Sequence, residues 1–245
     1  MLSACFLQEK LLFFPEKLPS DFKFQFAHSF EEKYIACPSG DTLSALLFNA
    51  HSAKGTVIYF HGNAGSLRTW GSVAERFLKE NYSIIIIDYP RYGKSRGKLS
   101  EENLFSDAQA VLNEVKKQTD ESHIVVYGRS LGTGIAAHLA SENHPQKLIL
   151  ESPYYSLKDV AHHVYPFLPT FILRYPIRTD LFLPKVKCPV YVFHGTDDEV
   201  IYYESSLKLQ KLFKTSDTLF TIPGAHHNDL NNFDGYKSNL RYILH

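Results

Sequence analysis

The sequence is poor in cysteine, tryptophan and long apolar runs, and it has no excess of charge of either sign. It contains three cysteines and one tryptophan, and its 26 basic and 26 acidic residues give a net charge of zero. Cys5, Cys37 and Cys188 are widely spaced and form no CxxC pair, which argues against a disulfide framework and a thiolate metal site. Because Cys37 and Cys188 lie in apolar strand-like contexts, we expect buried, unreactive thiols there. The balanced charge gives no indication of a nucleic-acid partner.

No stretch approaches the run of about 18 apolar residues that a membrane-spanning helix requires. Residues 1–15 are mildly apolar but lack the charged n-region of a signal peptide. We therefore expect a cytoplasmic protein without a transmembrane span, and peripheral membrane association stays open. Residues 2–5, LSAC, resemble a bacterial lipobox, which requires an apolar region upstream. The alternative is a lipid-anchored protein, if the native chain has a signal segment before Cys5.

A chain of 245 residues with 44% apolar and 21% charged residues is long enough for a large α/β domain, and we predict one domain over residues 1–245. Strand-like runs occur at residues 34–37, 43–49, 55–60, 83–88, 123–128, 147–151, 189–194 and 217–222. Helical patterns occur at residues 66–80, 101–118, 131–143, 203–213 and 233–244. The alternation predicts a mostly parallel sheet of about eight strands with helices on both faces. The first two strands are predicted to form an antiparallel hairpin at its edge.

Residues 124–134 read IVVYGRSLGTG, an apolar strand that runs into G-x-S-x-G at residues 128–132. The bare pattern is weak evidence because it also arises by chance. Here it follows a buried type of strand and opens a helix rich in small residues, which is typical of a nucleophile elbow. Glycines at 128 and 132 allow a tight turn with backbone close by, and the turn would present the Ser130 hydroxyl at the sheet edge.

A serine hydroxyl needs an imidazole to take its proton and a carboxylate to orient that imidazole. With an elbow of this kind the carboxylate follows the serine in the chain, and the histidine comes last. The loop after the seventh predicted strand holds Asp197, Asp198 and Glu199, and the loop after the last strand holds His226 and His227. The residues alone leave the choice within each loop open.

Acyl transfer also requires backbone N–H groups aimed at the oxygen that becomes negative. One should be the N–H of Leu131, immediately after the serine. The second should come from residues 61–65, HGNAG, which follow an early strand. Within this loop we expect Asn63 to supply the N–H, with Ala64 as the alternative.

Four polar residues near these loops are expected to have structural roles. We expect His61 to buttress the loop at 61–65 by hydrogen bonding, and Asp88, at a strand end, to brace the loop that follows it. His194 is expected to be a strand-end residue and not a ligand. Arg129 is expected to form a structural salt bridge, with a substrate carboxylate as its alternative partner.

The histidines give no metal-binding pattern. The pairs at 162–163 and 226–227 are adjacent, so their side chains point apart, and no H-x-x-x-H spacing occurs. We therefore expect neither a metal nor another cofactor.

Residues 152–188 interrupt the alternation of strands and helices with many prolines and aromatic residues. The segment is too long for a βα loop and too apolar for a linker. We predict a small lid of short helices, inserted above the serine and lining an acyl pocket, with ordinary core filling as the alternative. Tyr154, Tyr155 and Phe167 are its candidate substrate contacts.

Together these stretches resemble the α/β-hydrolase-fold serine hydrolases, and more narrowly the Bem46-type family with its ABHD13-like and ABHD17-like enzymes. The resemblance extends from about residue 10 to the C-terminus, with matching stretches at 12–15, 61–65, 88–95, 128–132, 151–153, 194–200 and 224–229. Two departures are Pro90-Arg91, where the family more often has Arg-Gly, and His226, where it has glycine.

The resemblance implies a catalytic triad of Ser130, Asp198 and His227. The family's acid stands third after the strand-end glycine, and its histidine directly precedes Asn-Asp. We therefore expect a serine hydrolase that cleaves esters or thioesters of small-molecule or acylated substrates through an acyl-enzyme at Ser130. The resemblance implies carboxylesterase or acyl-protein thioesterase activity. The alternatives are a peptidase or amidase of the same fold, and a non-catalytic binding protein that uses this fold.

Overall fold

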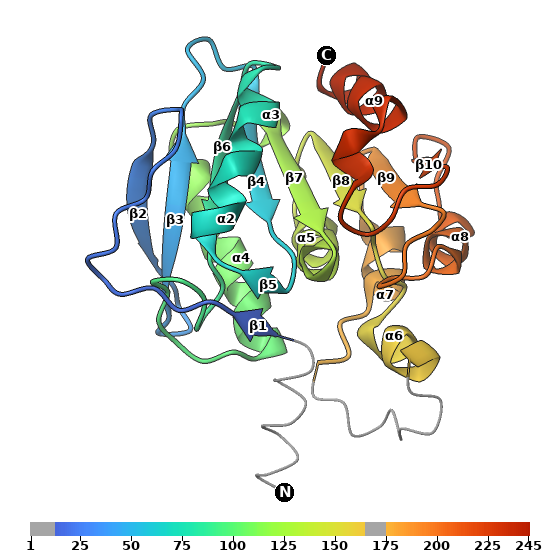
Figure 1. The fold of residues 1–245 in the computed structure, drawn as a ribbon, viewed down its shortest axis with the longest axis horizontal. Helices are drawn as coiled ribbons and strands as arrows, with labels where there is room; N and C mark the ends of the chain where they lie inside the picture. The colour runs from blue at the N-terminus through green and yellow to red at the C-terminus, as the bar shows by residue number, and fades with distance from the viewer. Residues whose placement is uncertain (1–12, 165–174) are drawn as a thin grey trace, which may run out of the picture.

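The computed structural model describes residues 13–164 and 175–245, and its centre is an eight-stranded sheet (Figure 1). The strand order is β10-β9-β8-β7-β4-β6-β3-β2. The strands are β2 (Glu31–Ala36), β3 (Thr42–Phe48), β4 (Gly55–Phe60), β6 (Tyr82–Ile87), β7 (Ile124–Arg129), β8 (Lys147–Glu151), β9 (Val190–Gly195) and β10 (Thr218–Ile222). β2 and β3 form an antiparallel edge hairpin, β3 is antiparallel to β6, and the remaining pairs are parallel. The predicted sheet and its edge hairpin are confirmed.

Helices cover both faces of this sheet (Figure 1). One face carries α4 (Glu101–Val115), α5 (Leu131–Glu142), α6 (Leu157–Val164), α7 (Thr179–Phe182) and α8 (Glu204–Gln210). The other face carries α2 (Leu67–Trp70), α3 (Ala74–Leu78) and α9 (Asp234–Leu244). Short 3₁₀ turns are η1 (Gly71–Val73), η2 (Glu121–His123), η4 (Leu183–Lys185) and η5 (Leu230–Asn232).

One predicted helix is wrong in detail. The pattern at residues 66–80 predicts a single helix, whereas the structure divides it into α2, η1 and α3. The interruption falls at Gly71, where an added Cβ would lie 2.2 Å from the ring of Phe26. Glycine weakens a helix and also lets the aromatic ring approach the backbone at this point.

The central strands are buried along their whole length because both faces of the sheet are covered, and this explains their continuous apolar runs. Cys37 and Cys188 lie in this interior as free thiols. The predicted burial is therefore confirmed for both thiols. Burial raises the pKa of Cys37 to about 12 and that of Cys188 to about 11, which disfavours the reactive thiolate. Cys5 lies outside the described residues.

The segment 152–188 contains short helices, as the sequence predicts. In its described part, α6, α7 and η4 pack on the face of the sheet that also carries α5. Residues 165–174 lie outside the described part, and a lid role for the segment stays a prediction. In residues 13–164 and 175–245, no helix is long and apolar enough to cross a membrane.

The chain turns sharply between β7 and α5, at Ser130. This residue has φ +50° and ψ −116°, a conformation that is strained for a residue with a side chain. An added Cβ on Gly132 would lie 2.1 Å from the Phe60 carbonyl oxygen, and one on Gly128 would lie 2.5 Å from the Gly132 carbonyl oxygen. Position 132 therefore requires glycine because β4 and the turn are in backbone contact, and position 128 requires it because the first turn of α5 packs against it.

We predict that Gly132→Ala lowers the free energy of unfolding by roughly 2 kcal/mol, because the new methyl group overlaps the β4 backbone. Gly235→Ala is the matched control: the position is exposed, an added Cβ meets only Ile222 at 3.9 Å, and it lies in α9. Alanine there should raise stability by roughly 0.5 kcal/mol. Urea titrations of both variants measure the difference, and equal changes would contradict the steric argument.

Candidate active site

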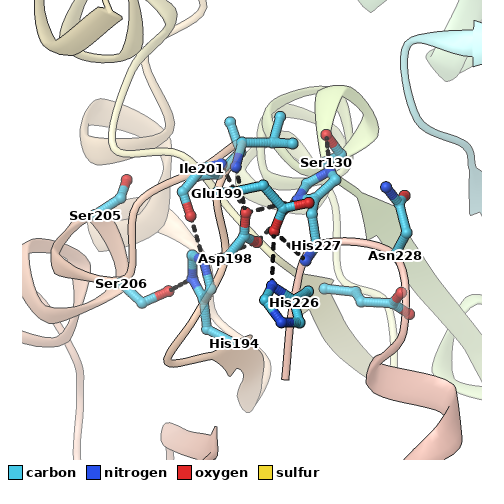
Figure 2. Close-up of polar contacts among 12 residues, drawn as sticks. Ser130, His194, Asp198, Glu199, Ile201, Ser205, Ser206, His226, His227 and Asn228 are labelled. Atoms are coloured by element: carbon cyan, nitrogen blue, oxygen red, sulfur yellow. Dashed lines mark hydrogen bonds and ion pairs between the residues drawn. The ribbon is translucent and has the colours of Figure 1, made fainter. Parts of the chain in front are cut away.

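The structure brings Ser130, His227 and Asp198 into direct contact (Figure 2). Ser130 lies at the β7–α5 turn, Asp198 in the loop after β9 and His227 in the loop after β10. His227 Nε2 is 3.1 Å from Ser130 Oγ, and His227 Nδ1 is 2.8 and 3.0 Å from the two Asp198 carboxylate oxygens. Since a carboxylate only accepts, we assign the proton to Nδ1, which leaves Nε2 to accept from the serine hydroxyl.

The neighbouring aspartate and histidine are directed elsewhere. Asp197 is exposed and accepts a hydrogen bond from the hydroxyl of Thr196. The exposed His226 ring lies 3.2 Å from Glu199. The geometry thus favours Asp198 and His227 in the two loops where the residues alone left a choice.

Asp198 is buried among groups that stabilise its ionised form. Its Oδ1 accepts the N–H groups of Val200 and Ile201 at 2.9 and 2.8 Å. Burial alone would raise the pKa of Asp198, but hydrogen bonds from His194 and His227 outweigh it and hold that pKa well below its usual value. The carboxylate therefore stays charged at neutral pH and can stabilise a protonated His227.

A second histidine, His194, contacts the Asp198 carboxylate in addition to His227 (Figure 2). His194 is fully buried, and its Nε2 lies 2.8 Å from the Ile201 carbonyl oxygen and 3.3 Å from Asp198 Oδ2. Because both neighbours only accept, Nε2 carries a proton; Nδ1 lies 2.6 Å from Ser206 Oγ. Sequence reasoning identified His194 as a strand-end residue and missed its contact with the acid.

The glycine-rich loop at residues 61–65 is held through its carbonyl groups. The carbonyl oxygen of His61 accepts from Tyr89 Oη, and that of Gly62 accepts from His61 Nδ1, both at 2.6 Å. The carbonyl oxygen of Asn63 accepts from Tyr92 Oη at 2.7 Å and from Phe14 N at 2.9 Å. That of Ala64 accepts from Trp70 Nε1 at 2.8 Å. In a trans peptide the N–H points opposite to its carbonyl, so these bonds also fix the direction of the N–H of Asn63 and of Ala64. Residues 64–65 form β5, which pairs with β1 (Phe14–Pro15) at the lower edge of the sheet in Figure 1.

The other predicted donor, Leu131, is the first residue of α5, where a backbone N–H has no partner within the helix. It directly follows Ser130. An added Cβ on Gly62 would lie 3.7 Å from Ser130 Cβ, so the glycine-rich loop passes beside the serine. The two predicted donor segments thus adjoin the same hydroxyl group.

His61 bonds the Gly62 carbonyl oxygen, as the sequence predicts, whereas the Asp88 carboxylate contacts His61 and α2 instead of the predicted loop after β6. Both side chains are fully buried, with His61 Nε2 3.4 Å from Asp88 Oδ1. Asp88 Oδ1 also accepts the N–H of Leu67 at 3.0 Å. The end of β6 is thereby tied to the loop at 61–65 and to the start of α2.

The candidate substrate contacts differ in accessibility. Tyr154 is fully buried, and its hydroxyl donates to the Leu131 carbonyl oxygen at 3.0 Å. In this structure the Tyr154 side chain packs against the first turn of α5 and is not accessible to a substrate. Tyr155 is only partly buried, so a substrate contact there stays a prediction. Phe167 lies outside the described residues.

A buried ionic cluster adjoins the serine. Arg129 Nε lies 2.9 Å from Glu151 Oε1, which gives Arg129 the predicted salt bridge. Arg76 and the hydroxyl groups of Tyr127 and Tyr236 reach the other Glu151 oxygen. Burial alone would raise the pKa of Glu151, but the two guanidinium groups outweigh it and hold that pKa below its usual value.

Of this cluster the sequence predicted only the salt bridge of Arg129, and not the partners Glu151, Arg76, Tyr127 and Tyr236. The available signal was Glu151 itself, a carboxylate at the end of an apolar strand, which needs buried partners. Within residues 13–164 and 175–245, no group of three or more His, Cys, Asp or Glu side chains is arranged to hold a metal ion.

Comparison with known proteins gives consistent matches. The profile of the family described as "Serine aminopeptidase, S33" matches residues 51–181. Protein bem46 of Schizosaccharomyces pombe is 31% identical over 206 residues, which are 80% of this chain and 69% of that protein. Alpha/beta hydrolase domain-containing protein aho-3 of Caenorhabditis elegans is 34% identical over 213 residues, 86% of this chain. The match spans only 61% of aho-3.

Among solved structures, the esterase Pf2001 of Pyrococcus furiosus superposes with a TM-score of 0.76. The match covers 95% of this chain and 96% of that one, at 20% sequence identity. At this identity the likeness concerns the fold.

We predict that Asp198→Asn slows the reaction of Ser130 with a fluorophosphonate by roughly 10³-fold or more. The amide would donate to His227 Nδ1 and so place the ring proton on Nε2, facing the serine. Asp197→Asn is the control and should react at the wild-type rate. The rates can be followed by intact-protein mass spectrometry, and equal slowing of both variants would contradict the assignment of the acid.

Proposed function

Because this chain belongs to the α/β-hydrolase family, among its Bem46-type members, we propose that it is a serine hydrolase that cleaves carboxylic esters or thioesters through an acyl-enzyme at Ser130. The observation that carries the proposal is the unbroken contact from Asp198 through His227 to Ser130. The fully ionised acid, the histidine tautomer and the elbow geometry all serve proton removal from this hydroxyl.

The proposed reaction has two steps. Ser130 Oγ attacks the acyl carbon while His227 Nε2 takes its proton, and the protonated ring then gives that proton to the leaving alcohol or thiol. Water next attacks the acyl-enzyme with His227 again as base, which releases the acid and restores Ser130. In both steps the N–H groups of Leu131 and Asn63 stabilise the negative oxygen, with Ala64 as the alternative donor.

The surroundings of the serine support an acyl group of some hydrophobicity. Phe14, whose N–H bonds the Asn63 carbonyl, is 52% exposed, and Val200, whose N–H bonds Asp198, is 44% exposed. Two exposed apolar side chains are thus carried by residues whose backbones bond the glycine-rich loop and the acid. The names of the similar proteins suggest the first substrates to test. The Pyrococcus esterase suggests esters, and the serine aminopeptidase profile suggests amides.

We predict that a fluorophosphonate probe labels the wild-type protein and leaves Ser130→Ala unlabelled, because the variant lacks the activated hydroxyl. Peptide mapping should place the adduct on Ser130. Turnover is then measured with p-nitrophenyl esters of increasing chain length, an acyl-CoA, an S-acyl peptide and an aminoacyl p-nitroanilide. Activity on the anilide alone would favour the peptidase, and absence of both label and turnover in folded protein would favour the non-catalytic binding protein.

A further inference from the structure

Arg129, the residue before the serine, contacts several separate parts of the site. Its Nε bonds Glu151 at the end of β8. Its Nη2 donates to the His227 carbonyl oxygen at 3.0 Å and to Asn228 Oδ1 at 2.9 Å. The guanidinium carbon lies 5.0 Å from the centre of the Trp70 ring. One cation therefore connects the elbow, the strand beside it and the loop that carries the general base.

The contact with the backbone of the His227 loop differs in kind from the bonds made by the N–H groups of His226 and His227. The His227 N–H reaches the exposed Glu199 at 3.4 Å, and the His226 N–H donates to Asp229 at 2.7 Å. Arg129 is only 14% exposed, and Glu151, which anchors it, is 5% exposed. A hydrogen bond from a charged donor is stronger when it is shielded from water, so the Arg129 bond restrains His227 more than the exposed bonds do.

The stacking on Trp70 extends the same restraint to the glycine-rich loop. The Trp70 indole N–H donates to the Ala64 carbonyl oxygen at 2.8 Å, and its ring stacks on His61 with 5.5 Å between ring centres. The elbow and the loop of the proposed base thus contact Arg129 directly, and the glycine-rich loop is connected to it through Trp70.

We propose that Arg129 is the positioning residue of the site, holding the backbone of His227 so that Nε2 faces Ser130 Oγ. The inference rests on the proposed function. Arg129 makes no proton transfer itself; it fixes the distance between base and nucleophile. Loss of the restraint should lower kcat and leave KM nearly unchanged, because misalignment affects the reacting atoms and not the acyl pocket.

Arg76 provides a matched control because it pairs with the same buried carboxylate. Its guanidinium contacts Glu151 and the Tyr236 hydroxyl, and within the described residues it has no hydrogen bond to the His227 loop. Arg129→Lys and Arg76→Lys each retain a positive charge near Glu151. Lysine has a single ammonium group and cannot reproduce the branched contacts of Arg129.

We expect Arg129→Lys to lower kcat by roughly 10- to 100-fold with KM within about twofold, and Arg76→Lys to change kcat by less than about threefold. A measurement without turnover accompanies the kinetics: the low-field proton resonance of His227 Nδ1–H should shift or exchange faster in Arg129→Lys only. Equal kcat losses, or an unchanged resonance in Arg129→Lys, would overturn the inference.

Failure of the proposed function is distinguishable from failure of this inference. If wild-type protein shows no turnover, the proposed function fails, while the resonance still reports whether Arg129 positions His227. If Arg129→Lys does not fold, Arg129→Gln replaces it and Arg76→Gln is its control, because each change removes one guanidinium group and leaves the other paired with Glu151. A larger kcat loss in Arg129→Gln than in Arg76→Gln supports the proposal, and equal losses refute it.

Discussion

The pairing of β4 with β7 is the constraint on which the site depends. Phe60 and Gly128 are partners in this register, so the glycine-rich loop and the elbow leave the sheet side by side. The contact between the Phe60 carbonyl and Gly132 then leaves no room for a side chain. Two strand ends in register thus supply the proposed nucleophile and the segments that carry both predicted oxyanion donors. A shift of one residue in this pairing would separate them.

The second determinant is charge that is buried and fully compensated. Asp198 and Glu151 are both carboxylates with little access to water, and each has cationic or N–H partners that keep it ionised. Buried ion pairs of this kind add little to stability, because desolvation offsets their attraction. They do fix direction, since a charged group with several bonds has few orientations open to it. In this protein Asp198 bonds the His227 ring directly, and Glu151 holds Arg129, which bonds the His227 carbonyl oxygen.

The sequence was sufficient to predict the eight strands of the main sheet, the edge hairpin and the loops that carry Ser130, Asp198 and His227, because these follow from apolar runs and glycine-rich turns. It did not indicate the two-residue strands β1 and β5. The break at Gly71 was not predictable, since it depends on Phe26, a residue distant in the chain. The contacts of Glu151 were missed for the same reason, because its partners come from α3, β7 and α9. The partners of His194 lie only 4 to 12 residues further along the chain, and its contact with Asp198 depends on how the loop after β9 turns back on that strand.

The order of the site in the chain has a consequence for folding. Ser130 and His227 are 97 residues apart, and Asp198 and His227 follow the two strands that complete one edge of the sheet. Contacts between such distant residues form late, because closing long loops is entropically costly. A chain still emerging from the ribosome therefore carries Ser130 without its acid or its base. Under the proposed mechanism its hydroxyl remains an ordinary alcohol until the last strands pair, so folding itself would control when the chain becomes reactive.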